Sequence, residues 1–452
     1  MAETMTRRGR YSGPWVIFWV GFLLRVVVIV VGHTYRIRTD QAEFNFGFEA
    51  GRIARSLVRG QGYANPFNGI SGPTAWLPPI YPLLLALSFK LFGVYTNAAA
   101  LFVLVVDSAF SAGTALAVYE IGARCFDARG FDTSGLARRG ATQAMPVAMW
   151  SAWLWAVHPA ALQYGVHWLW ETAVSTFFFS WAVVVALRLR GVGEESEAEA
   201  AGRSGQWAML GLLWGAVNLS NVSLLLCLPG MLVWIVWPAL RGRRWQELRR
   251  GVAGAVVACV VMSAVMLPWW VRNERAFHAF VPTRGNLGFE LYQSTRETND
   301  GYNWGTTLPL WPGDPEFKRY VREGELKMGR ERVAEALATM RAKPAETERW
   351  TLQRFLFFWD GPPKPLGRHP WQEYGRQLSY AFLSACGLLG LGLMLRRRVE
   401  GAGLMALMFL LVPLPYYLVT VQARFRHPIE PLIAVLGVWL FRSAEPRAVV
   451  RD

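Results

Sequence analysis

The chain has few cysteines and no internal repeat, and its N-terminal apolar run does not resemble a cleavable leader. Its 452 residues include only four cysteines, one in a basic loop and three in apolar blocks, and no two of them have the spacing of metal ligands. We therefore predict no structural disulfide. The N-terminal apolar run contains Arg25 and lacks a small-residue cleavage site, so we interpret it as a retained membrane span. A repeat with a period of 20–50 residues is also lacking.

The apolar residues are gathered in blocks about as long as a bilayer is thick. A spanning helix needs roughly 20 mainly apolar residues. The blocks lack the alternation of strands, and only helices or closed barrels satisfy the backbone in lipid. We therefore predict an all-α polytopic membrane protein of about ten spans. The predicted spans are 14–33, 97–120, 143–161, 172–189, 206–220, 223–239, 252–271, 377–395, 402–421 and 429–442.

The net charge of +15 follows a topological pattern. The basic residues cluster in short segments at 7–10, 124–139, 241–250 and 396–398, as the positive-inside rule predicts for cytoplasmic loops. All of these segments share one side if the short run 80–93 is re-entrant or interfacial instead of spanning. Both termini are then cytoplasmic. We predict membrane lipids as partners and no nucleic acid.

This topology leaves two long segments outside, 34–96 and 272–376. Within the second, the apolar spacing over 323–341 predicts a helix that Pro344 ends. The predicted parts are a transmembrane core over 1–271 that includes the outer loop 34–96, a small extracytoplasmic domain over 272–376, and C-terminal transmembrane helices over 377–452.

The first outer loop carries an amphipathic stretch. Residues 44–58 can form a helix with Arg52 and Arg55 on one face, lying in the interface with its cations near phosphate, or an ordinary surface helix. Three acids of this loop stand close to the membrane on the outer side: Asp40, Glu43 and Glu49.

A second cluster joins two spans at their outer ends. Glu171 begins a long apolar helix, and its carboxylate suits a helix N-terminus electrostatically. His167 and Trp168 precede it, and imidazole, carboxylate and indole together also suit a sugar pocket, in which polar groups bind hydroxyls and an aromatic face packs on the ring. Both interpretations remain open.

Arginines stand at two further outer positions. Arg272 and Asn273 follow the seventh span, where Arg is either a membrane anchor or a ligand of a lipid phosphate. Arg424, Arg426 and His427 run against the positive-inside pattern, which favours an anion-binding role over anchoring.

Two charges fall inside predicted spans, Arg25 and Asp107. Charges within the bilayer are costly and usually paired. We therefore predict a structural ion pair between these two residues in preference to a proton pathway.

Several motifs together resemble a known superfamily. They are G-x-G-Y at 60–63, GPTAWLPPIYPLLLALSFKLFG at 72–93, HWLWETAVS at 167–175, PWWVRN at 268–273, VPTRGNLGFELY at 281–292 and RFRHPIEPL at 424–432. Their order and spacing are similar to those of bacterial GT-C glycosyltransferases near family 39, the protein O-mannosyltransferases and lipid A aminoarabinose transferases. The resemblance covers nearly the whole chain.

The resemblance implies a polyprenyl-phosphate sugar donor and an inverting transfer onto a hydroxyl of a lipid, glycan or protein acceptor. It implies the cytoplasmic membrane of a cell and an active site outside it. A carboxylate takes the acceptor proton, and cations offset the charge of the departing phosphate. Tyr81, in the 72–93 motif, then joins the substrate-binding residues.

The family's acid usually precedes a stretch like Ile53-Ala54-Arg55. Glu49 stands one turn before this stretch, so we rank it first as the base, Asp40 second and Glu43 third. Glu171 matches the superfamily's second acidic site. The acids have no DxD arrangement, so the sequence predicts no certain cofactor and gives little support for a divalent metal.

Two other functions stay open. A non-catalytic transporter or flippase of lipid-linked sugars has a related substrate, but transporters tend to have paired repeats around a midplane site. A ligase or polymerase that moves whole glycans from a lipid carrier would have a similar topology.

Overall fold

The computed structural model describes residues 13–37, 46–127, 146–193, 203–296, 307–362 and 370–444. Helices form the regular structure of these segments, beside one isolated bridge between Ala64 and Pro73. The first half contains α1 (Pro14–Val31), α3 (Glu49–Val58), α4 (Ile80–Phe92), α5 (Asn97–Gly122), η2 (Ala123–Asp127), α6 (Val147–Val157), α7 (Pro159–Val166), α8 (Thr172–Leu189) and α10 (Arg203–Asn218). The second half contains η3 (Val222–Leu224), α11 (Cys227–Arg241), α12 (Trp245–Phe277), α13 (Leu287–Ser294), α14 (Pro315–Glu323), α15 (Glu325–Ala342), α16 (Pro344–Asp360), α17 (Pro370–Arg396), α18 (Ala402–Leu411), α19 (Leu414–Leu418), η4 (Ala423–Ile429) and α20 (Glu430–Ser443).

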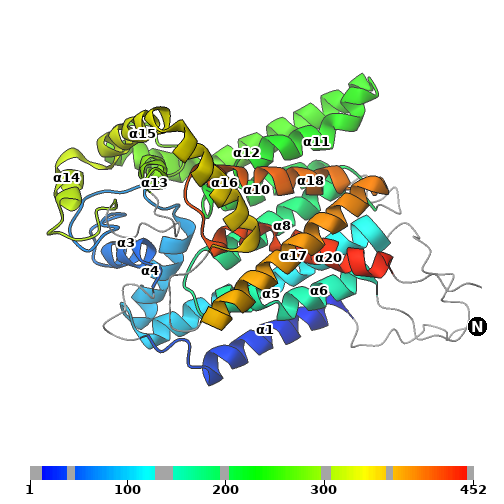
Figure 1. Ribbon diagram of the computed structural model, residues 1–452, viewed down its shortest axis with the longest axis horizontal. Coiled ribbons are helices and arrows are strands. Elements are labelled where there is room, and N and C mark those ends of the chain that lie inside the picture. The colour runs from blue at the N-terminus through cyan, green and yellow to red at the C-terminus, as the bar shows by residue number, and fades with distance from the viewer. Residues whose placement is uncertain are drawn as a thin grey trace, which may run out of the picture.

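The long apolar helices form one bundle. Figure 1 shows α1, α5, α8, α12, α17 and α20 running along the long axis, with α3 and α13–α15 gathered at the left end and the turn between α11 and α12 at the upper right. This basic turn, Arg241–Arg244, is therefore far from α3 and α14. The protein is an all-α polytopic membrane protein, as predicted.

Helix α1 illustrates how the bundle meets lipid. Its buried residues recur every four positions, at Ile17, Gly21, Arg25 and Ile29. Large apolar residues such as Trp19 on the other faces are exposed. An exposed apolar face of this kind is stable against the hydrocarbon of a bilayer and costly to expose to water. Of the described helices, six are long and apolar enough to cross a membrane, and the predicted count of ten spans remains a prediction.

Two predicted spans are interrupted by proline. The span predicted at 143–161 is two helices, α6 and α7, that meet at His158-Pro159. The span predicted at 402–421 is divided into α18 and α19, next to Pro413 and Pro415. Proline has no N–H to continue a helix and clashes with the preceding turn. The short run predicted at 80–93 is the 13-residue helix α4.

The predicted ion pair between Arg25 and Asp107 is wrong. Arg25 donates to the carbonyls of Gly21 and Ala156, both at 2.9 Å, and to Ser111 Oγ at 3.1 Å. Ala156 lies in the last turn of α6, where carbonyls lack intrahelical donors, so the break before Pro159 supplies an acceptor. Asp107 accepts instead from the Tyr81 hydroxyl at 2.8 Å.

A smaller core lies at the α3 end of the bundle. Phe67 and Trp76 of the first loop pack with Phe289, Tyr320 and Met328 of α13–α15. The helices predicted at 44–58 and 323–341 are observed as α3 and α15. The two chain segments that the topology placed outside therefore share one core.

Buried Glu325 joins these segments by hydrogen bonds. Its carboxylate accepts from the Ala75 N–H at 3.0 Å, Thr74 Oγ1 at 2.5 Å and the Tyr320 hydroxyl at 2.7 Å. The Gly285 N–H donates to the Ala75 carbonyl at 2.8 Å. This network holds the loop before α13 against the first loop, beside the candidate site.

Candidate active site

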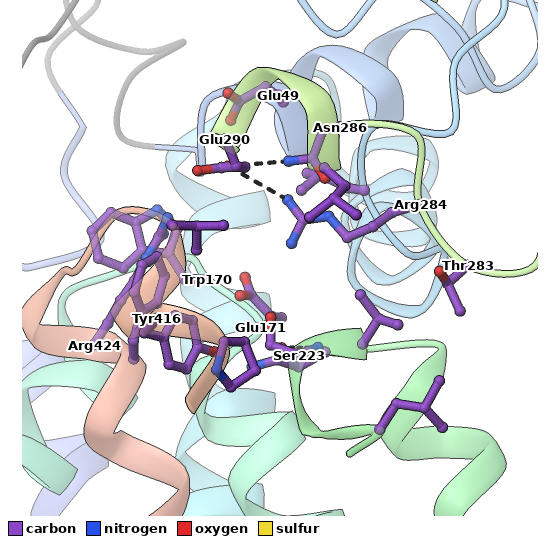
Figure 2. A pocket seen from close by; sticks show the side chains of 18 of the residues that line it. Glu49, Trp170, Glu171, Ser223, Thr283, Arg284, Asn286, Glu290, Tyr416 and Arg424 are labelled. Atoms are coloured by element: carbon purple, nitrogen blue, oxygen red, sulfur yellow. Dashed lines mark hydrogen bonds and ion pairs between the residues drawn. The ribbon is translucent and has the colours of Figure 1, made fainter. Parts of the chain in front are cut away.

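A cavity of about 630 Å³ lies where the bundle meets α3 and α13. Its walls come from segments far apart in the sequence: the start of α3, the loop before α8, η3 with the start of α11, the loop before α13, α19 and η4. Figure 2 shows the polar side chains that converge on it. The labelled lining residues are Glu49, Trp170, Glu171, Ser223, Thr283, Arg284, Asn286, Glu290, Tyr416 and Arg424.

The turn before α3 aims Glu49 into this cavity. Gly47 has φ +73° and Phe48 φ +49°, so the chain reverses sharply before the first residue of the helix. A Cβ on Gly47 would lie 2.4 Å from the Leu169 carbonyl oxygen, which makes glycine necessary at this close approach. Glu49 and Glu171 line the same cavity.

Burial dominates the electrostatics of Glu49. Desolvation raises the pKa of the Glu49 carboxyl above its ordinary value, although its own backbone N–H, Arg52 and Arg424 act to lower it. The nearby Glu290 raises it further. Burial therefore outweighs the neighbouring arginines, which favour the ionised form.

Arg424 supplies an available cation. Its guanidinium lies over the Trp170 ring, 4.2 Å from the centroid, and Trp170 stacks on Trp168 with centroids 4.6 Å apart. Within the described segments its Nε is buried without a hydrogen-bond partner. A planar guanidinium with free N–H groups is suited to bind phosphate by two hydrogen bonds.

The cavity contains a second acid–base pair that the sequence interpretation missed. Arg284 Nη2 lies 3.9 Å from Glu290 Oε1, and this oxygen also accepts from Asn286 Nδ2 at 3.1 Å. The other oxygen of Glu290 accepts from Thr420 Oγ1 at 3.0 Å. The motif VPTRGNLGFELY contains Arg284 and Glu290 and was the available signal, but only the fold brings it opposite Glu49.

Several predicted site residues lie outside the cavity lining. Arg52 is buried on α3, where its Nη1 donates to the Pro66 carbonyl at 3.5 Å, and Arg55 lies over the Tyr95 ring at 5.7 Å. Tyr81 is buried against Asp107. Exposed His167 packs its ring edge on Trp168 without lining the cavity.

The arginines at the two other outer positions have structural partners. Arg272 Nη1 donates to the Thr74 carbonyl at 2.7 Å and to Asn273 Oδ1 at 2.9 Å, and Asn273 in turn donates to the Val281 carbonyl. Arg426 is buried in an ion pair with Glu430, with Nε to Oε1 at 2.6 Å.

His427 is also buried, between the Trp155 and Tyr164 rings. Of the predicted arginines at 272, 424 and 426, only Arg424 lines the cavity that holds Glu49.

Two predicted acids, Asp40 and Glu43, lie outside the described residues. In the segments that are described, no group of three His, Cys, Asp or Glu side chains is arranged to hold a metal ion.

No known family model and no curated protein sequence matches the chain. Solved structures do match its fold. Apo oligosaccharyltransferase from Archaeoglobus fulgidus is 14% identical, with 96% of this chain and 50% of that chain covered and a TM-score of 0.52. The complex of that archaeal enzyme, AglB, with an inhibitory peptide and a dolichol-phosphate is 13% identical, with 95% and 50% covered and a TM-score of 0.51. ArnT from Cupriavidus metallidurans bound to undecaprenyl phosphate is 17% identical, with 94% and 77% covered and a TM-score of 0.40.

The chain shares the fold of the archaeal oligosaccharyltransferase, in agreement with the GT-C fold that the sequence motifs imply. At these identities the likeness establishes the fold alone. The chain spans about half the length of the archaeal oligosaccharyltransferase chains that it matches.

Proposed function

We propose that this protein is a glycosyltransferase that moves a sugar from a polyprenyl-phosphate-linked donor to an acceptor hydroxyl. The observation that carries the proposal is the convergence of Glu49, Glu171 and Arg424 on one cavity. A carboxylate with a raised pKa and a guanidinium with free donors are the groups that such a transfer needs. A dolichol-phosphate bound to the archaeal neighbour supports a lipid phosphate as the donor class.

In this reaction Glu49 takes the proton of the acceptor hydroxyl as its oxygen attacks the anomeric carbon. The bond between that carbon and the phosphate oxygen breaks on the opposite face, so the anomeric configuration inverts. The bond's electron pair leaves with the polyprenyl phosphate, whose developing charge Arg424 offsets. Glu171, across the cavity from Glu49, binds sugar or acceptor hydroxyls. The enclosing walls limit competing hydrolysis.

The apolar part of the lining accounts for a lipid carrier. Leu225, Leu226 and Pro229 at the start of α11 and Leu287 at the start of α13 border the cavity, and Leu225, Leu226 and Leu287 are exposed. A polar head and an apolar exit suit an amphiphile better than a free nucleotide sugar. The acceptor is a hydroxyl of a lipid, a glycan or a protein.

The test is reconstitution in proteoliposomes with short-chain polyprenyl-phosphate sugars and measurement of released polyprenyl phosphate. We expect acceptor-dependent release by the wild type and by Glu346→Gln, which alters an exposed glutamate on α16. We expect strongly reduced release by Glu49→Gln. Movement of intact donor across the bilayer without any release would instead favour a transporter.

We further propose that the cavity faces the extracytoplasmic side, with 272–376 as an outer domain. The basic turn of the α11–α12 hairpin lies at the opposite end of the bundle, where the positive-inside rule places the cytoplasm. Single cysteines at exposed Lys318 on α14 and Arg243 in that turn test the sidedness. A membrane-impermeant maleimide added to intact cells should label position 318 and spare position 243. The reverse pattern would invert the topology.

A further inference from the structure

A second hollow lies on the other side of the first loop. It has a volume of about 970 Å³ and is bounded by the loop 61–73, the start of α4 and the last turns of α12. Leu77 lines the first cavity, whereas Pro79 and Ile80 line this groove, so the segment between them separates the two. The proposed transfer reaction makes no use of it.

The lining of the groove changes from apolar to positively charged along α12. The lining residues Val265, Pro268, Arg272 and Arg275 recur every three to four positions, which places them on one face of the helix. The first two are apolar, and the last two carry positive charge near the end of α12. Exposed Leu83 continues the apolar part on α4.

The length of this face matches one leaflet of a bilayer. Arg275 follows Val265 by ten positions, and a helix rises 1.5 Å per residue, so the face extends over about 15 Å. The hydrocarbon core of a bilayer is about 30 Å thick, so each leaflet contributes about 15 Å. A lipid whose chain lies along Val265 and Pro268 therefore brings its headgroup to the level of Arg275.

The two arginines differ in their availability. The guanidinium of Arg272 is occupied by hydrogen bonds to the carbonyls of Thr74 and Tyr63. Arg272 therefore contributes only its positive field to the groove. Arg275 is exposed, and no hydrogen bond or ion pair to another part of the described chain occupies its guanidinium. Exposed Glu274 precedes it but does not line the groove. The mouth of the groove is therefore net positive.

From this juxtaposition we infer that the groove is a binding site for an anionic glycerophospholipid of the surrounding bilayer. Its chain packs on the apolar face of α12 and on Leu83, and its phosphate pairs with Arg275. A polyprenyl-phosphate donor bound here would hold its phosphate behind the Leu77–Ile80 segment, away from Glu49. The groove is thus distinct from the proposed donor site.

Such a lipid has a structural consequence for the first cavity. The floor of the groove contains Tyr63 and Trp269, whose rings pack edge to face at 5.0 Å. Arg272 links this floor to the Thr74 carbonyl, next to the Ala75 peptide that holds the loop of Arg284. Filling the groove therefore supports the wall of the cavity that carries Arg284.

The experiment uses the full chain in nanodiscs of phosphatidylcholine that contain a photoreactive phosphatidylglycerol or, in a parallel sample, a photoreactive phosphatidylcholine. Crosslinks to the peptide containing 265–276 are quantified by mass spectrometry. We expect phosphatidylglycerol to label this peptide more strongly, and Arg275→Gln to reduce the preference about fivefold, the value of one arginine near an anionic headgroup. Arg330→Gln, an equal charge change at an exposed position of α15, should leave the preference unchanged.

A second variant tests the apolar part. Val265→Trp fills the groove and should remove labelling by both lipids. Three results would overturn the inference: equal labelling by the two lipids, an unchanged preference in Arg275→Gln, or displacement of phosphatidylglycerol by a short polyprenyl phosphate. The last result would assign the groove to the donor. All of these readouts are independent of transferase activity, so they do not depend on the proposed function.

Discussion

Replacing Glu49 by glutamine is the most direct perturbation of the proposed chemistry. The carboxylate lines the cavity, and its one hydrogen bond within the described chain is to its own backbone N–H. Glutamine keeps the size and shape of the side chain and loses its basicity. We therefore expect the variant to fold, to bind donor and to fail in catalysis.

The size of the effect follows from the role of a general base. Such a base contributes typically 10²–10⁴-fold to a rate. This corresponds to about 3–5 kcal/mol of transition-state stabilisation. Turnover should fall by that factor while donor binding survives, because glutamine removes no donor contact that the base itself makes.

The pH dependence supplies a signature that a structural defect would not reproduce. Burial raises the pKa of Glu49, and a base works only when it is deprotonated, so turnover should rise with pH through a pKa above the ordinary value of about 4.3. Glu290→Gln removes a neighbouring negative charge and should move this limb to lower pH. Arg424→Gln removes a positive charge and should move it to higher pH.

The assay is the initial rate of polyprenyl phosphate release from proteoliposomes over a pH series, with Glu346→Gln as the matched control. Wild-type turnover by Glu49→Gln would refute the assignment of the base. If Asp40→Asn were then inactive, the base would be Asp40. If both variants were fully active, the enzymatic interpretation of the first loop would fail.

Three further outcomes are expected. Arg424→Lys keeps the charge but loses the planar fork, so donor affinity, measured by isothermal titration, should fall by about tenfold or more, the value of one charged hydrogen bond; unchanged affinity would remove Arg424 from the phosphate site. Arg426→Met leaves the buried Glu430 carboxylate without its partner and should lower the free energy of unfolding by about 3–5 kcal/mol, measured by thermal denaturation in detergent; a variant as stable as the wild type would show that the pair contributes little. Glu325→Ala leaves buried donors of the first loop without their acceptor. The free energy of unfolding should fall by about 1–3 kcal/mol, and limited proteolysis of α14–α15 should become faster; wild-type protection would contradict this.

Much of the fold was predictable because its signals are local. The spacing of neighbouring residues predicts the apolar blocks, the amphipathic stretch of α3 and the helix that ends before Pro344. The breaks at His158-Pro159 and around Pro413 were visible as prolines, but hydropathy alone joins the apolar residues on both sides. Arg25 was assigned to Asp107 because both are charged. The structure instead satisfies Arg25 with carbonyls that a broken helix end provides.

The candidate site was predictable only in part, because it is assembled from distant segments. Glu49, Glu171 and Arg424 each stand out as polar residues beside an apolar block, and each lines the cavity. Arg424 and Arg426 are two residues apart and looked equivalent in the sequence. They belong to a 3₁₀ helix with three residues per turn, so positions two apart point in different directions, one into the cavity and one into the core.

The charges around the cavity suggest how donor binding prepares the base. Arg284 is paired with Glu290, so Arg424 is the cation whose positive field acts on Glu49 while its own hydrogen-bond donors are available. A donor phosphate bound to Arg424 would neutralise that field and bring negative charge of its own. The pKa of Glu49 should then rise above its value in the free protein, which makes the carboxylate a stronger base when the donor is in place. Donor binding should therefore be accompanied by net proton uptake near that pKa, detectable as a buffer-dependent heat of binding, and Glu49→Gln should abolish it. An uptake that persists in Glu49→Gln would assign the titrating group to another residue.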